Sequence, residues 1–228
     1  MGSHDVVIVT EAHLTPAVSD SVVSLPGFRL IRVHRSEAAI KKNEGGVVVY
    51  VREELMPYCT VVARDNSAPG CEILWLRIGM LTGRSLLLAA CYLAPEMSKV
   101  YPLGGPSNVA REAAAITAFG RLQAGYAEHQ IGTDDLLIAG DLNARVAGVR
   151  DIPLSDELDA LRERFPQAGP DSQAYFGIRE RSSCDAKANM FGEHLGQLCR
   201  SLGLVILNGR VHGDRSGSLT FPKDDGGG

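Results

Sequence analysis

The sequence predicts a single α/β domain, and three observations carry that prediction. Short apolar runs separated by glycine-containing turns fill the first half of the chain, which is typical of strands. Apolar residues recur at helical spacing in two stretches of the second half. With 228 residues, 45% of them hydrophobic, the chain is long enough to bury the core that packed layers need.

Five strands are predicted in the first half, over residues 6–9, 28–33, 47–51, 73–78 and 86–92. The run at 6–9 contains only β-branched residues and has no helical period, which indicates a strand buried on both faces. Pro26-Gly27 and residues 43–46 predict turns before the second and third strands, and residues 81–84 predict a hairpin turn before the fifth.

Two long helices are predicted in the second half. The first has Ser107 as its N-cap and extends to about His129. The second covers residues 191–202, where leucines follow Phe191 at intervals of three and four, and it ends at Gly203 as a C-cap. A strand is predicted directly after it, at 204–207.

Between these helices lie a buried strand at 136–139 and a mixed segment at 151–183. That segment predicts a short helix at 156–165 and a loop rich in proline, glycine and glutamine. Its charges, Asp151 among them, indicate a solvated surface.

Composition excludes several classes of protein. A formal net charge of −4 argues against a basic arm that coats nucleic acid by charge alone. The longest apolar runs fall far short of the roughly 20 residues that cross a bilayer. The five cysteines include no C-x-x-C pair, so neither a disulfide framework nor a zinc ribbon is indicated, and we expect reduced thiols in an intracellular protein without an export signal.

The residues that could carry chemistry follow predicted strands. The strand at 136–139 runs into Gly140-Asp141-Leu142-Asn143, where the glycine permits a close turn and the Asp and Asn side chains point the same way. Glu11 follows the first strand in the same manner. A hard cation such as Mg²⁺ takes one or two carboxylates and keeps several waters. Taken alone, however, a Gly-Asp-x-Asn sequence is equally explained as a turn with an Asx hydrogen bond.

Five motifs in order carry a resemblance to a known family. They are Thr10-Glu11-Ala12-His13-Leu14, residues 45–52 (GGVVVYVR), Cys91-Tyr92-Leu93-Ala94-Pro95, Gly140-Asp141-Leu142-Asn143-Ala144, and a set of positions between 189 and 221. Together they resemble the endonuclease/exonuclease/phosphatase superfamily, specifically the apurinic-type endonuclease domain of non-LTR (LINE-like) retroelements. The resemblance covers nearly the whole chain and implies a four-layer αββα sandwich, in which two packed mixed β-sheets are flanked by helices.

The resemblance also implies roles for individual residues. Glu11 would bind Mg²⁺, or Mn²⁺ in its place, and Tyr92 would contact the phosphate or the transition state. Asp141 would orient or deprotonate the attacking water, Asn143 would hold the phosphate, and Thr220 would lie beside the site. The alternatives are an exposed strand-end carboxylate for Glu11 and simple packing for Tyr92, because Ala94 replaces the usual proline.

Arginines are the candidates for contacts with a DNA backbone, since guanidinium groups pair with phosphate bidentately. Arg145 is the one closest in sequence to the Asp141 motif, and the others are Arg150, Arg179, Arg181, Arg210 and Arg215. The alternative is that they only keep the surface soluble.

Departures from the family pattern bear on activity. The family has a first strand ending in Asn before the Glu strand, and a Ser-Asp-His segment near its end, and this sequence contains no Asp-His dipeptide. We therefore expect residues 1–228 to form one domain that is truncated at both ends, with exposed sheet edges that favour marginal stability or association. Little or no nuclease activity is expected unless a partner or further sequence completes the site, so whether the chain is an enzyme stays open.

The leading functional hypothesis is a metal-dependent DNA endonuclease that nicks target DNA for reverse transcription. Its partners would be DNA and a reverse transcriptase domain of the same polyprotein, and its place of action the nucleus. One alternative is an abasic-site nuclease or a phosphatase of small phosphoesters. The other is a catalytically inactive domain with a structural or nucleic-acid-binding role.

Overall fold

The computed structural model describes residues 4–35, 44–103, 105–152 and 181–218. Internal contacts divide the chain into two compact units, residues 1–143 and residues 144–228. No helix in the described ranges is both long and apolar enough to span a membrane. The prediction of one incomplete domain is left untested by this division.

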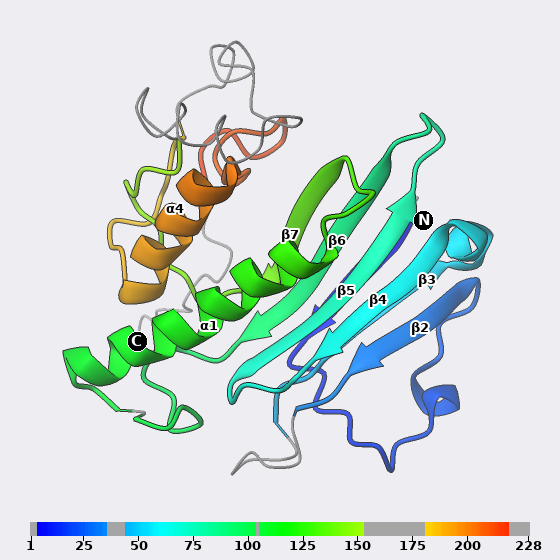
Figure 1. Ribbon diagram of the computed structural model, residues 1–228, viewed down its shortest axis with the longest axis horizontal. Coiled ribbons are helices and arrows are strands. Elements are labelled where there is room, and N and C mark those ends of the chain that lie inside the picture. The colour runs from blue at the N-terminus through cyan, green and yellow to red at the C-terminus, as the bar shows by residue number, and fades with distance from the viewer. Residues whose placement is uncertain (1–3, 36–43, 104, 153–180, 219–228) are drawn as a thin grey trace, which may run out of the picture. The chain divides into compact units, whose positions relative to one another are not determined.

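Two sheets make up the first unit (Figure 1). The smaller sheet is antiparallel, with strand order β1-β3-β2, from β1 (Val6–Thr10), β2 (Phe28–Val33) and β3 (Val47–Arg52). The larger sheet has the order β4-β5-β6-β7, from β4 (Cys59–Asp65), β5 (Cys71–Gly79), β6 (Ser85–Leu93) and β7 (Asp135–Asp141). Its first three strands are antiparallel, whereas β6 and β7 run parallel. Two short 3-10 helices accompany them, η1 (Asp20–Val23) and η2 (Glu53–Tyr58).

The two sheets pack face to face, and helix α1 (Asn108–His129) covers the outer face of the larger sheet (Figure 1). Strand β5 is therefore buried on both faces, and Trp75 at its centre is fully buried. Gly125 permits the helix to approach closely, because a Cβ at that position would lie 2.5 Å from the Trp75 ring. The α/β class with two packed sheets and a flanking helix is confirmed.

Helix α1 begins as the sequence predicts. The Ser107 side chain accepts a hydrogen bond from the Ala110 amide at 3.1 Å, which satisfies one of the amides that a helix start leaves without a partner. The helix connects β6 to β7, as a parallel pair of strands requires. Because these two strands are parallel, the polar residues at their carboxyl ends come out at the same edge of the sheet.

Several strand predictions need correction. Strand β4 was missed, because its sequence mixes Thr60 and Arg64 with apolar residues and a β-bulge interrupts its register between Val61 and Ala63. The predictions that residues 6–9 are buried on both faces and that residues 136–139 form a buried strand are wrong in their burial. In the described structure β1 and β7 are the outermost strands of their sheets, and Val9 and Leu137 are 40% and 36% exposed.

The second unit contains helix α4 (Met190–Leu202). Asn189 caps its start by accepting a hydrogen bond from the Gly192 amide, and Gly203 ends it in the left-handed conformation with φ 68°. This helix is as predicted, including its last residue and its C-cap. The short helix predicted at 156–165 lies outside the described residues.

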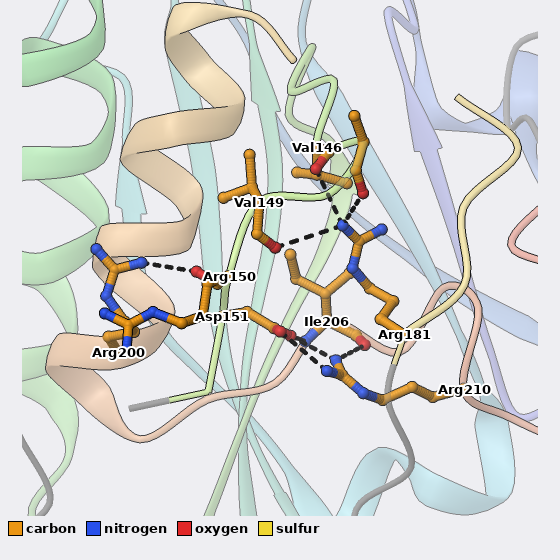
Figure 2. Close-up of polar contacts among 9 residues, drawn as sticks. Val146, Val149, Arg150, Asp151, Arg181, Arg200, Ile206 and Arg210 are labelled. Atoms are coloured by element: carbon orange, nitrogen blue, oxygen red, sulfur yellow. Dashed lines mark hydrogen bonds and ion pairs between the residues drawn. The ribbon is translucent and has the colours of Figure 1, made fainter. Parts of the chain in front are cut away.

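The strand predicted at 204–207 does not form. The Ile206 amide donates instead to the Asp151 carboxylate at 2.6 Å, and the Ile206 carbonyl accepts from Arg210 at 2.7 Å (Figure 2). A buried ion pair thus takes the backbone groups that a sheet would need. Asp151 is 3% exposed, so the prediction of a solvated surface at this residue was also wrong.

Candidate functional site

Three strand ends converge in the first unit. Tyr92 in β6 is the register partner of Asp141, the last residue of the parallel strand β7. Strand β1 contacts both β6 and β7, and Glu11 is the residue directly after it. Polar side chains that are up to 130 positions apart in the sequence are thereby collected at one edge.

Tyr92 and Glu11 form the central contact of this edge. The phenol hydroxyl donates to Oε1 of Glu11 at 2.5 Å. Tyr92 is 3% exposed, whereas Glu11 is exposed, so the tyrosine links the core to a carboxylate in contact with solvent. Burial raises the pKa of Tyr92, and the hydrogen bond and the charge of Glu11 raise it further. The phenol therefore remains a hydrogen-bond donor at neutral pH.

Asp141 and Asn143 lie on the loop that follows β7. The backbone N–H of Asn143 donates to Oδ1 of Asp141 at 2.9 Å. This is the Asx hydrogen bond that the sequence alone allows. Nδ2 of Asn143 donates to the Leu93 carbonyl at 2.8 Å and so fastens the loop to the end of β6. The Asp141 carboxylate also lies near enough to Tyr92 to contribute to its raised pKa, after burial and Glu11.

Backbone conformation at this edge is unusual. Glu11 and Asn143 have φ of 49° and 48°, the left-handed region that residues other than glycine seldom adopt. Such conformations cost free energy and gather at functional sites. Gly140 is required for a different reason, because a Cβ there would lie 1.9 Å from the Cys91 carbonyl oxygen.

The carboxylates at this edge suit a hard divalent cation. Among the described residues no group of three or more histidine, cysteine, aspartate or glutamate side chains gathers as a metal site. Glu11 would be the protein ligand, with water and a phosphate oxygen completing the shell. Mg²⁺ is bound in this way by many proteins, through one or two carboxylates.

Two buried charges next to Tyr92 were missed from the sequence. Nε of Arg35 donates to Oε1 of Glu72 at 2.8 Å, and the Arg35 guanidinium carbon lies 5.8 Å from the centroid of the Tyr92 ring. A signal was available, since Glu72 and Arg77 are the two charged residues of a mainly apolar strand, and a charge there is seldom buried without a partner.

The remaining predicted residues belong to the second unit. Thr220 and Arg179 are outside the described residues. Arg145 belongs to the second unit, where its guanidinium makes two hydrogen bonds to the Asp185 carboxylate, at 2.9 and 2.5 Å. Its predicted contact with substrate stays a prediction.

Two further arginines of the second unit have internal partners (Figure 2). Arg181 donates to the carbonyl groups of Val146, Ala147 and Val149. Arg210 forms a bidentate pair with Asp151. These contacts favour structural roles for both arginines over contacts with phosphate.

Among solved structures, the chain is similar to the human Nocturnin catalytic domain with bound sulfate anion, with 13% sequence identity and a TM-score of 0.40. The match covers 62% of this chain and 52% of that one, so the chain spans about half the length of that structure. No protein-family model and no curated protein matches the sequence.

Proposed function

We propose that the first unit catalyses metal-dependent hydrolysis of phosphodiesters, with DNA as the substrate. One observation carries this proposal: Glu11, Tyr92 and Asp141 lie together at the ends of β1, β6 and β7. Two carboxylates and a protonated phenol at one edge would supply a place for a cation, a base and a donor toward phosphate.

Each side chain has a task that its surroundings support. Asp141 is exposed and accepts a backbone amide on Oδ1, so its carboxylate is held in place where water can reach it. It would orient and deprotonate the attacking water. Tyr92 keeps its proton, which it donates to Glu11 here and would donate toward the oxygens on which charge develops once Glu11 binds a cation. A divalent cation held by Glu11 supplies Lewis-acid polarisation of the phosphoryl group.

The finer proposal is that the chain nicks target DNA to prime reverse transcription, in the nucleus and beside a reverse transcriptase domain. It is supported by the ordered motifs from Thr10 to Asn143, and Arg145 would contact the DNA backbone. Asn143 would hold the phosphate in this scheme, and Thr220 would lie beside it.

A second candidate function is a domain that binds nucleic acid without cutting it. The observation in its favour is that Nδ2 of Asn143 donates to the Leu93 carbonyl, and that Asp141 takes part in an ordinary Asx turn. Both contacts also serve a loop whose only role is structural.

Nicking of supercoiled plasmid DNA tests the proposal. The proposal expects wild-type protein with Mg²⁺ to convert the plasmid to the open circle, in contrast to the little or no activity that a truncated domain would show, and a chelator should stop it. Asp141→Ala should slow nicking by roughly 100-fold or more, the range of a lost general base. The matched control is Asp135→Ala, because Asp135 begins the same strand that Asp141 ends.

The outcomes separate the hypotheses. Equal nicking by wild type and Asp141→Ala would contradict the assigned role of Asp141. DNA binding without cleavage would favour the inactive domain. Release of phosphate from a small phosphoester without nicking would favour a phosphatase, and selective cleavage of an abasic oligonucleotide would favour an abasic-site nuclease.

A further inference from the structure

Arg35 and Glu72 form an ion pair that joins the two sheets of the first unit. Arg35 follows β2 of the smaller sheet, and Glu72 lies in β5 of the larger one. Their side chains are 4% and 1% exposed. Removing two charges from water costs about as much as their attraction returns, so such a pair is weak evidence for stability alone. Its position next to Tyr92 provides another reason for its presence.

The Arg35 guanidinium contacts Tyr92 from the side of the core. Its Cζ atom lies 5.8 Å from the ring centroid, within the range of a cation–π contact. The hydroxyl of the same ring donates to Glu11. Glu72, Arg35, Tyr92 and Glu11 therefore form a continuous chain of contacts from the buried interior to an exposed carboxylate.

Gly45 leaves the space that the guanidinium occupies. A Cβ on Gly45 would lie 2.4 Å from Nη2 of Arg35, and the residue has φ of 75°. The Gly45 carbonyl also accepts from the His13 amide at 2.9 Å, so the same turn supports the backbone just after Glu11. The position of Arg35 is thus set by Glu72 and by the absence of a side chain at residue 45.

We propose that Arg35 is a positioning residue, which Glu72 holds so that the flat guanidinium fixes the Tyr92 ring with its hydroxyl on Glu11. A lysine would keep the charge but has neither the planar face nor the Nε–H that binds Glu72. The consequence for catalysis rests on the proposed function, whereas the consequence for the tyrosine ring does not.

Gly45→Ala tests this role without changing any charged side chain. It would displace the Arg35 guanidinium, because the added carbon takes its place. The matched control is Gly27→Ala: Gly27 has φ of 78°, so the backbone strain is similar, but an added Cβ meets nothing within 4 Å. A difference between the two variants therefore reports on the Arg35 guanidinium or on the turn beside Glu11, and Arg35→Lys, which leaves that turn unchanged, separates the two.

The first measurement is the ring resonance of Tyr92 in protein with ¹³C-labelled tyrosine. The chain has six tyrosines, and Tyr92→Phe identifies the resonance by its loss. We expect this resonance to move in Gly45→Ala and Arg35→Lys and to stay in place in Gly27→Ala. Glu72→Gln should move it less, because glutamine keeps an oxygen that accepts from Arg35.

The second measurement is nicking kinetics. Gly45→Ala and Arg35→Lys should lower kcat roughly tenfold to a hundredfold, since small displacements of a reacting group have effects of this size. KM for DNA should stay within about twofold, because binding to substrate is not the lost interaction. Gly27→Ala should keep the wild-type kcat.

An unchanged Tyr92 resonance in both Gly45→Ala and Arg35→Lys would overturn the proposal. Where either variant fails to fold, the Tyr92 resonance of the other tests the proposal. Where both fail, an unchanged Tyr92 resonance in Glu72→Gln would overturn it. A wild-type protein that does not cleave DNA would contradict the proposed function only, because the tyrosine resonance still tests the positioning role.

Discussion

Two regions of the molecule each contain a buried pair of arginine and carboxylate, and they use it differently. In the first unit the pair is Arg35 with Glu72, and in the second it is Arg210 with Asp151. The side chains are similarly buried, at 4% and 1% exposed in the first pair and 7% and 4% in the second. The chemistry is the same, so the surroundings must account for the difference.

Backbone groups surround the second pair. Asp151 accepts from the Ile206 amide, and Arg210 donates to the Ile206 carbonyl (Figure 2). Arg200 nearby donates to the Arg150 carbonyl at 2.6 Å. These contacts close loops that have no sheet to satisfy them, which gives the second pair a structural role.

A side chain contacts the first pair instead, because the Arg35 guanidinium lies against the Tyr92 ring. The carboxylate pKa values differ accordingly. Burial raises the pKa of Glu72, although the hydrogen bond and charge of Arg35 act to lower it. Burial would also raise the pKa of Asp151, but hydrogen bonds from Arg210 and Ile206, with the Arg210 charge, outweigh it and lower the pKa. Ionisation of Asp151 therefore stabilises the fold, whereas burial opposes the ionisation of Glu72.

The largest effect is expected from Asp151→Ala. It leaves the Arg210 charge buried without a counterion and the Ile206 amide without its acceptor, which should cost about 3–5 kcal/mol of unfolding free energy. Urea denaturation followed by circular dichroism measures it. Asp185→Ala is the control, since it breaks a more exposed pair with Arg145 and should leave the midpoint unchanged. Equal midpoints for Asp151→Ala and wild type would contradict the structural role of the second pair.

A smaller effect is expected when each carboxylate becomes a neutral amide. Asp151→Asn should cost roughly 1–3 kcal/mol, the value of hydrogen bonds to a charged group, and Glu72→Gln should cost less. The reason is the opposite direction of the two pKa shifts. The same urea titration measures both variants. A larger loss of unfolding free energy in Glu72→Gln than in Asp151→Asn would contradict the difference between the two ion pairs.

Tyr92→Phe should have a modest effect on stability and a clear one on activity. Loss of one hydrogen bond to Glu11 should cost about 0.5–1.5 kcal/mol, because the ring itself stays packed. Under the proposed function, nicking should slow by roughly tenfold or more. Tyr50→Phe is the matched control, since its hydroxyl donates to the Val23 carbonyl, away from the three strand ends. Equal loss of nicking in both variants would argue against a specific role for Tyr92.

Acid should reduce the difference in unfolding free energy between wild type and Asp151→Asn. The pKa of Asp151 is lowered in the folded protein, so the unfolded state binds its proton more readily as the pH falls. The stabilisation is complete above the unfolded value of about 3.9 and is lost as the pH drops through the folded value. Urea midpoints of the two proteins should therefore approach each other below about pH 4. A constant difference between pH 7 and pH 3 would contradict the lowered pKa.

Arg145→Ala should have the smallest effect on stability, none that can be measured, because Arg145 and Asp185 form an ion pair at the surface. If Arg145 contacts a phosphate, the slope of log affinity for DNA against log salt should fall by about 1. Arg84→Ala is the matched control, because the Arg84 side chain also pairs with an aspartate, Asp135. Its exposure is similar, at 57% compared with 53% for Arg145. The same slope in both variants would remove Arg145 from the DNA surface.

Much of the fold could be predicted from local patterns. The spacing of apolar residues and the caps at Ser107 and Gly203 located both long helices, because helix periodicity and capping depend on residues close in sequence. Strand β4 could not be found in this way, since its residues alternate irregularly around a bulge. The strand at 204–207 was wrongly predicted, because its backbone partners come from Asp151, more than 50 positions away.

The candidate site shows the same division. Strand ends and a glycine marked Glu11, Asp141 and Asn143 locally, whereas Tyr92 was singled out by the resemblance that the five ordered motifs carry. Arg35 and Glu72 escaped notice, since nothing near them in the sequence indicates that they meet. Their pairing depends on the packing of the two sheets, which brings together residues that are distant in the sequence.

By itself the sequence determined the residue types, the helices, most strands and the order in which polar residues follow strand ends. Only the tertiary structure decided that Tyr92 donates to Glu11, that Asp151 is buried, and that Arg35 lies against the Tyr92 ring. The physical reason is that periodicity and capping are properties of neighbouring residues, whereas burial and charge pairing depend on which elements pack together.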